Sequence, residues 1–196
     1  MKLQINFIRG GAPGGGDERF LGKLNKPLAE SEKINLAKKA CAGEYPPAQM
    51  VFSSGLSRCF EAAQVIYPAL PVIILPELAP FDYGEFTGLT YSEIFSDKRF
   101  AQFSNPGFTP SPPGGEGSVH IFLARCSAAI KKIAREGERK NAESVSVVTH
   151  RMVIAAILSR YCAPRPLYRD WKINYGGGYA CSYDIPRCLL EIITNF

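Results

Sequence analysis

The sequence is poor in metal-binding residues and lacks paired cysteine motifs. Only two of its 196 residues are histidines, and its six cysteines include no Cys-x-x-Cys pair. Neither histidine has a cysteine close by in the sequence, which argues against a zinc site, and no carboxylate cluster has the spacing of a magnesium or calcium site. We therefore expect neither a metal nor any other cofactor.

Long apolar runs are also missing. No segment approaches the ~20 apolar residues that a membrane span requires, and residues 1–8 alternate apolar and polar side chains as a strand does, unlike a signal peptide. We expect a cytoplasmic protein with reduced thiols and no membrane partner. The net charge of +5 is a mild basic excess, which suits a small anionic ligand and does not require nucleic acid. The sequence leaves the oligomeric state open.

The hydrophobic pattern alternates between strands and helices. Strand-like runs occupy residues 3–8, 50–53, 72–75 and 145–149, and helix-like stretches occupy about 29–42, 55–67, 118–136 and 151–162. This alternation favours an α/β fold with a largely parallel sheet. Residues 171–193 predict further strands joined around the glycines at 176–178, and residues 10–22 and about 97–117 predict irregular loops.

Two patterns typical of phosphate-binding loops are present only in part. Gly11 and Gly16 have the spacing of a nucleotide-binding loop, but two acidic residues follow at 17–18, where lysine and a hydroxyl residue are required. Cys181 and Arg187 have the spacing of cysteine phosphatases, but an acidic residue and a proline without an N–H interrupt the stretch. Cys59, in contrast, is interpreted as core packing.

Four segments, in chain order, resemble the histidine phosphatase superfamily, which includes the phosphoglycerate mutases. Residues 7–11 read Phe-Ile-Arg-Gly-Gly where the family has Arg-His-Gly, and residues 53–63 match its Ser-Ser-x-Leu-x-Arg-x-x-x-Thr-Ala pattern. Residues 78–91 are close to its Leu-x-Glu-x-x-x-Gly-x-x-x-Gly run, and residues 147–150 end where the family places its second histidine. The α-ribazole phosphatases and related phosphoglycerate-mutase-like phosphatases are nearest in chain length and in the third segment.

The resemblance implies a single domain over residues 1–196. Its expected fold is a three-layer α/β/α sandwich with a mostly parallel central sheet, and residues 97–117 form a small insertion or cap. The resemblance also implies that Arg9, Arg58 and His150 form a cradle for a phosphate group, because arginine offers a planar fork of donors that fits two phosphate oxygens. The expected ligand is a phosphorylated small molecule or inorganic phosphate, and Phe100, Phe103 and Phe108 suggest an apolar wall.

The chain departs from the family at the positions that carry the chemistry. Gly10 stands where the family has the histidine that attacks phosphorus, and Pro80 stands where it has the carboxylic acid that protonates the leaving oxygen. Asp82 and Glu85 are nearby carboxyls that could replace the acid, but neither replaces the nucleophile. Losing the general acid alone typically forfeits ~10²–10⁴ in rate, and losing the nucleophile removes the covalent step.

These departures favour a protein that retains phosphate binding and has little or no phosphatase activity. One alternative is an active phosphomonoester hydrolase, similar to the α-ribazole phosphatases, in which water attacks phosphate held by the cradle. Another is an engineered His-to-Gly variant of a working enzyme. Further departures at Pro13, Gly16 and the Arg151–Met152 pair argue against the latter, because one engineered substitution would not explain them all.

Overall fold

The structure is a computed structural model, and it describes residues 2–15, 19–104, 111–115, 117–164, 166–167 and 170–196. At its centre is a six-stranded sheet with the strand order β3-β2-β4-β1-β5-β6. The strands are β1 (Lys2–Arg9), β2 (Met50–Ser53), β3 (Val72–Ile74), β4 (Ser144–Thr149), β5 (Gly178–Asp184) and β6 (Leu189–Asn195). β3, β2, β4 and β1 pair in parallel, whereas β5 and β6 are antiparallel additions.

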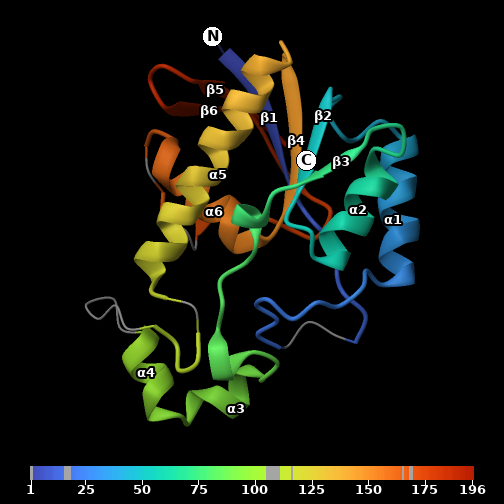
Figure 1. Ribbon diagram of the computed structural model, residues 1–196. Helices are drawn as coiled ribbons and strands as arrows, with labels where there is room; N and C mark the ends of the chain where they lie inside the picture. The colour runs from blue at the N-terminus through green and yellow to red at the C-terminus, as the bar shows by residue number, and fades with distance from the viewer. Residues whose placement is uncertain (1, 16–18, 105–110, 116, 165, 168–169) are drawn as a thin grey trace.

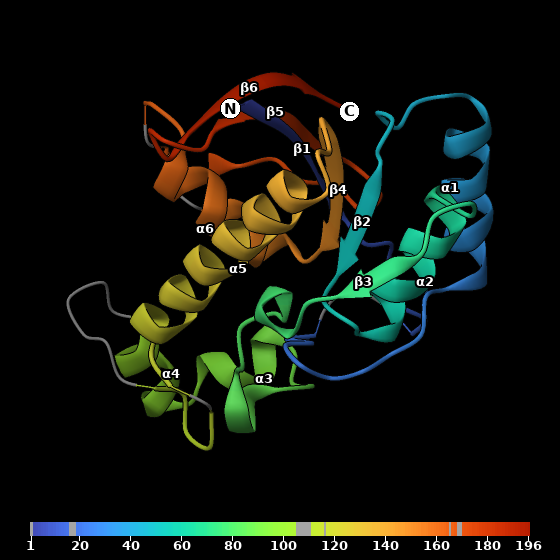
Figure 2. The same ribbon diagram turned by 45° about the horizontal axis from the view of Figure 1, so that its top comes forward.

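Helices cover both faces of this sheet. α1 (Glu30–Cys41) and α2 (Ser57–Ile66) lie on one face, and α5 (Val119–Arg139) and α6 (Arg151–Tyr161) lie on the other (Figures 1 and 2). The alternation in β1 explains the two layers, because Leu3, Ile5 and Phe7 belong to the core under α5 and α6, while Ile8 belongs to the core under α1 and α2. The predicted α/β fold with a mostly parallel sheet is confirmed.

Two short helices, α3 (Tyr91–Phe95) and α4 (Lys98–Ser104), lie together at one end of the molecule, away from the sheet (Figure 1). The single-turn 3-10 helices η1 (Pro76–Leu78) and η2 (Gly84–Phe86) connect β3 to this end. Within residues 97–117, where the sequence indicated an irregular segment or a small insertion, residues 98–104 form the helix α4. α3 begins with a capping box, in which Thr90 and Glu93 exchange hydrogen bonds. A capping box can mark a helix that is too short to show a repeated apolar face.

The prediction for the C-terminal strands was wrong in one respect. Gly176 and Gly177 precede β5, and Gly178 is its first residue, so these glycines do not join two strands. β5 and β6 are joined by a turn over residues 185–188. Gly178 is required by packing, because a Cβ there would collide with the backbone carbonyl of Phe7 on the neighbouring strand. Over the described residues, no helix combines the length and the apolar character that crossing a membrane requires.

Candidate functional site

The parallel strands bring the four sequence segments to one edge of the sheet. β1 ends at Arg9, opposite Thr149 at the end of β4, and the neighbouring β2 ends at Ser53. α2 and α6 begin within a few residues of these strand ends. The carboxyl ends of parallel strands are where ligand crevices form in such sheets. A cavity of about 280 Å³ lies at this edge, and Arg9, Gly10, Arg58, Pro80 and His150 all line it.

Arg58, in the first turn of α2, is 5% exposed and is held from several sides. Its Nη1 donates to the carbonyl of Leu24 at 2.8 Å, and its Nη2 donates to the carbonyl of Gly22 at 3.0 Å. Burial lowers the pKa of the Arg58 guanidinium from its ordinary value. Because arginine starts from so high a value, the group still carries its charge at neutral pH. The structure therefore fixes a cation on the cavity wall.

His150 follows β4 directly and is 8% exposed. Its Nδ1 lies 3.3 Å from Nη2 of Arg58, and its Nε2 lies 2.9 Å from Oγ of Ser54. A guanidinium can only donate, so Nδ1 accepts from Arg58 and the ring proton sits on Nε2, which donates to Ser54. Burial, together with the charges of Arg58, Arg9 and Arg125, lowers the pKa of His150 well below its usual value. The imidazole is therefore neutral at pH 7.

Arg9 is clamped by the segment that precedes β5. Its backbone N–H donates to Gly177 at 2.9 Å, its carbonyl accepts from Gly176 at 3.0 Å, and its Nη1 donates to the carbonyl of Ile173 at 2.9 Å. The ring of Tyr175 stacks against the guanidinium, with 3.4 Å between Cζ and the ring centroid. Stacking on the ring of Tyr175 holds the guanidinium in one orientation beside the cavity.

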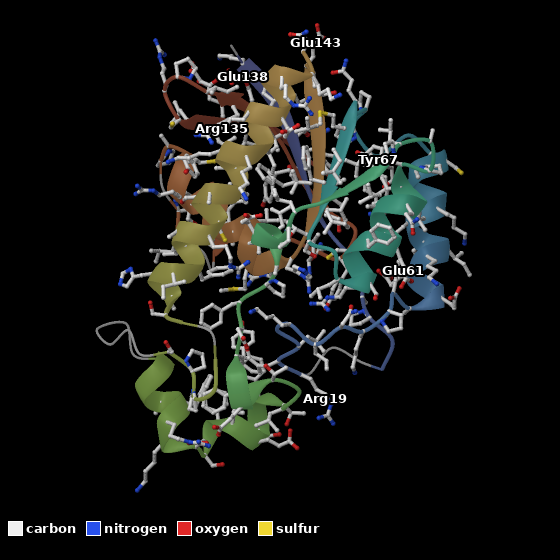
Figure 3. All side chains as sticks on the ribbon, viewed as in Figure 1. Arg19, Glu61, Tyr67, Arg135, Glu138 and Glu143 are labelled. Carbon is white, nitrogen blue, oxygen red and sulfur yellow. The ribbon has the colours of Figure 1, made fainter. Side chains whose placement is uncertain are left out.

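The cavity lining is strongly cationic. Arg19 and Arg151 join Arg9 and Arg58 on it, and none of the described residues that line it is a carboxylate. Arg151 opens α6 and donates to the carbonyl of Trp171 at 3.2 Å. Arg19 lies on the loop that faces the α3–α4 end, with its side chain directed outward (Figure 3). There its Nη1 donates to the carbonyl of Gly88 at 2.8 Å and lies 3.9 Å from the carboxylate of Glu93, so the positive charge inside the cavity comes from Arg9, Arg58 and Arg151. Such a group of cations favours an anionic ligand.

Comparison with known proteins fits this arrangement. The profile of the Histidine phosphatase superfamily (branch 1) matches residues 6–191. The chain belongs to this superfamily. Phosphoglycerate mutase-like protein 4 of Arabidopsis thaliana is 32% identical over 115 residues, which are 56% of this chain and 49% of that protein. The chain thus spans about half the length of the curated relative that it matches.

Solved structures of histidine phosphatases share the fold. The alpha-ribazole phosphatase of Shigella flexneri superposes with a TM-score of 0.79 at 20% identity, covering 97% of this chain and 94% of that one. The phosphoglycerate mutase of Bacillus anthracis superposes with a TM-score of 0.79 at 17% identity, covering 98% of this chain and 92% of that one. At these identities the likeness shows the fold alone.

The space beside Gly10, where the family resemblance expects a histidine, is filled by Cys59. A Cβ on Gly10 would lie 2.8 Å from Sγ of Cys59 and 3.3 Å from the carbonyl oxygen of Arg58. Cys59 is fully buried and lies 3.6 Å from both ring nitrogens of His150. Burial raises the pKa of its thiol to about 11, so at neutral pH it is not a thiolate and is a poor nucleophile. Cys59 does pack in the core, but at the cavity.

The structure does not bring the expected substitute acids to the cavity. Pro80 lines it, as expected, but the carboxylate of Asp82 accepts from the N–H of Gly84 at 2.9 Å and lies 3.4 Å from the amine of Lys23. Glu85 is exposed and its carboxylate lies 2.8 Å from Nη1 of Arg99. Neither Asp82 nor Glu85 is among the residues that line the cavity.

Sequence reasoning missed Arg125, a cation on the inner side of α5. Its guanidinium donates to the carbonyls of Glu77 at 3.0 Å, Ala79 at 2.6 Å and Pro80 at 2.9 Å. Arg125 thereby fixes the backbone around Pro80, the position at which the family resemblance expects the general acid. The signal was an arginine between Phe122 and Cys126 on the buried face of α5, where an ionised group needs several acceptors.

Other expectations concern residues away from the cavity or outside the described part of the chain. Phe100 packs against Phe20 and Phe86 and does not line the cavity. Phe108, the side chain of Phe103 and Gly16 lie outside what the structure describes. Among the described residues, no group of three or more histidine, cysteine, aspartate or glutamate side chains is placed to hold a metal ion.

Proposed function

We propose that this histidine-phosphatase-family protein binds the phosphoryl group of a phosphorylated small molecule at Arg9, Arg58 and His150, and hydrolyses it slowly or not at all. The observation that carries the proposal is one cavity that joins four arginines without a lining carboxylate and offers only glycine at the nucleophile position. The arginine fork suits phosphate oxygens, and the start of α6 adds backbone N–H groups at the same edge.

The packing around Gly10 supports weak or absent turnover. Covalent catalysis needs a nucleophile that reaches phosphorus. Beside Gly10 lies the buried thiol of Cys59, and next to that thiol lies His150, whose Nε2–H donates to Ser54 and whose Nδ1 accepts from Arg58. Pro80 lines the cavity at the position where the family resemblance expects a general acid, and its side chain has no proton to donate.

The same packing speaks against an engineered origin of Gly10. A histidine at this position would bring its Cβ to 2.8 Å from Sγ of Cys59, a separation that requires the thiol to move. For the same reason we expect added imidazole to restore no hydrolysis to the wild-type protein, although it could do so in Cys59→Ala, where the space is open.

Calorimetric titration with inorganic phosphate tests the binding half of the proposal. Wild-type protein should bind phosphate, and Arg9→Gln should weaken binding at least about tenfold, as the loss of a charge-assisted pair does. Arg135→Gln is the matched control, because Arg135 is an exposed arginine on α5 away from the cavity (Figure 3). Equal affinity of all three proteins would contradict the cradle.

An aryl phosphate assay tests the catalytic half. Wild-type protein should release phosphate no faster than Arg9→Gln, with or without millimolar imidazole. Rapid release by wild-type protein that Arg9→Gln abolishes would instead support the active hydrolase, in which water attacks the bound phosphate.

A further inference from the structure

One wall of the cavity is a continuous row of aromatic rings. The ring centroids of Phe81 and Tyr83 are 5.3 Å apart, those of Tyr83 and Phe20 are 4.9 Å apart, and those of Phe20 and Tyr91 are 4.6 Å apart. All four residues line the same cavity as Arg9 and Arg58. Cationic and aromatic side chains therefore line the same cavity.

The row runs from the interior to the mouth of the cavity. Phe81 is 5% exposed at the inner end, whereas Tyr91 is 59% exposed at the outer end. A large aromatic side chain held open beside a binding cavity is a common feature of ligand sites, because it offers apolar area that a ligand can cover. A ligand at the cavity mouth would cover part of the exposed ring of Tyr91.

The backbone holds this wall in place before any ligand arrives. Phe20 donates its N–H to Leu89 at 2.8 Å and accepts from Gly88 at 2.7 Å, so both sides of its peptide unit are fixed. Tyr91 opens α3, which the reciprocal capping bonds of Thr90 and Glu93 stabilise. Little ordering entropy is left to lose on binding, which is the condition under which aromatic contacts add most affinity.

We propose that the row formed by Phe20, Tyr83 and Tyr91 is a subsite for a flat aromatic group, so that the preferred ligands are phosphate monoesters of aromatic alcohols. This inference rests on the proposed function, since it assumes that the arginines hold the phosphate. The cavity volume of about 280 Å³ lies at the lower end of ligand pockets, which suits a phosphate with one small ring system. A polyhydroxylated alcohol would turn hydroxyl groups toward rings and lose hydrogen bonds to water.

Competition titrations compare three probes: inorganic phosphate, glycerol 1-phosphate and 1-naphthyl phosphate. The wild-type protein should bind naphthyl phosphate at least about tenfold more tightly than glycerol phosphate, as expected for a stacked ring. Tyr91→Ser should remove most of that preference and leave the affinity for inorganic phosphate within about twofold. Ile121→Ser is the control, because Ile121 is exposed and does not line the cavity.

The outcomes separate this inference from the proposed function. If inorganic phosphate binds but glycerol and naphthyl phosphates bind equally, the subsite is wrong and the cradle stands. If Ile121→Ser lowers the preference as much as Tyr91→Ser, the effect is a general loss of exposed apolar surface and the subsite is wrong. If no probe binds to the wild-type protein, both proposals are overturned.

Discussion

Adding a single methyl group at Gly10 should destabilise the protein, because Cys59 occupies the space. The ideal Cβ lies 2.8 Å from Sγ of Cys59 and 3.3 Å from both the Cα of Cys59 and the carbonyl oxygen of Arg58. Overpacking of this kind costs about 1–3 kcal/mol. Gly10 does not have a positive φ, so the cost comes from space and not from backbone strain.

A double-mutant cycle isolates the contact. Gly10→Ala alone should lower the free energy of unfolding by about 1–2 kcal/mol, the overpacking cost less the gain from a stiffer unfolded chain. Cys59→Ala alone should cost about 1 kcal/mol for the lost buried group. The double variant should be more stable than the sum of the two changes predicts, with a favourable coupling of about 1 kcal/mol. The recovery should be partial, because the backbone atoms at 3.3 Å remain.

Guanidinium denaturation of the four proteins measures all of these quantities. Unchanged slopes with shifted midpoints would show that the native packing has changed and the unfolded state has not. The reasoning would be refuted if Gly10→Ala were as stable as the wild-type protein. It would equally be refuted if the two substitutions were simply additive, since the thiol would then not be what excludes a side chain at position 10.

Three further predictions follow from single contacts at the site. Tyr175→Leu should weaken phosphate binding about threefold to tenfold by releasing the guanidinium of Arg9 from its stacked position, whereas Tyr175→Phe should retain the affinity, as titration calorimetry would show; equal losses in both variants would discredit the stacking role. Arg125→Gln should lower the free energy of unfolding by about 2 kcal/mol or more, because the carbonyls of Ala79 and Pro80 lose their donor. Chemical denaturation should detect this loss, and a loss below about 0.5 kcal/mol would contradict the role of Arg125 in holding this backbone. The pKa of His150 is lowered in the folded protein, so as the pH falls the unfolded chain binds the proton first. The contribution of His150 to the free energy of unfolding should therefore be complete above pH ~6.5 and fall by up to about 1.4 kcal/mol per pH unit below it. His150→Gln should flatten the plot of stability against pH between pH 6.5 and 5, and an unchanged slope would show that another group titrates.

The order of strands and long helices could be predicted because each carries its own periodic pattern. β1 alternates polar and apolar residues from Lys2 to Phe7, and α5 repeats apolar residues at helical spacing over many turns. α4 could not be predicted in this way, because a seven-residue helix is too short for the period to stand out. The misplacement of the C-terminal turn had a related cause. Gly178 is needed for close packing against Phe7 of β1, and a glycine in the sequence does not by itself distinguish packing from a turn.

The candidate site was predictable to the extent that it depends on strand ends. Arg9, Arg58 and His150 meet because parallel strands end at one edge, which sequence order already implies. The stacking of Tyr175 on Arg9 could not be predicted, because the two residues are 166 positions apart. The place of Cys59 beside Gly10 depends in the same way on how α2 packs against β1 and β4. Such contacts arise from tertiary packing and leave no local pattern.

We propose that the cavity holds a phosphoryl group without hydrolysing its ester. Phosphorus NMR of the wild-type protein with phenyl phosphate tests binding and hydrolysis in one sample. The account predicts a phenyl phosphate resonance that broadens or shifts with protein concentration, a weaker effect in Arg9→Gln, and no growth of the inorganic phosphate signal over hours. A growing phosphate signal that Arg9→Gln abolishes would contradict the claim of lost catalysis. A resonance that the protein leaves unchanged would contradict the claim of binding.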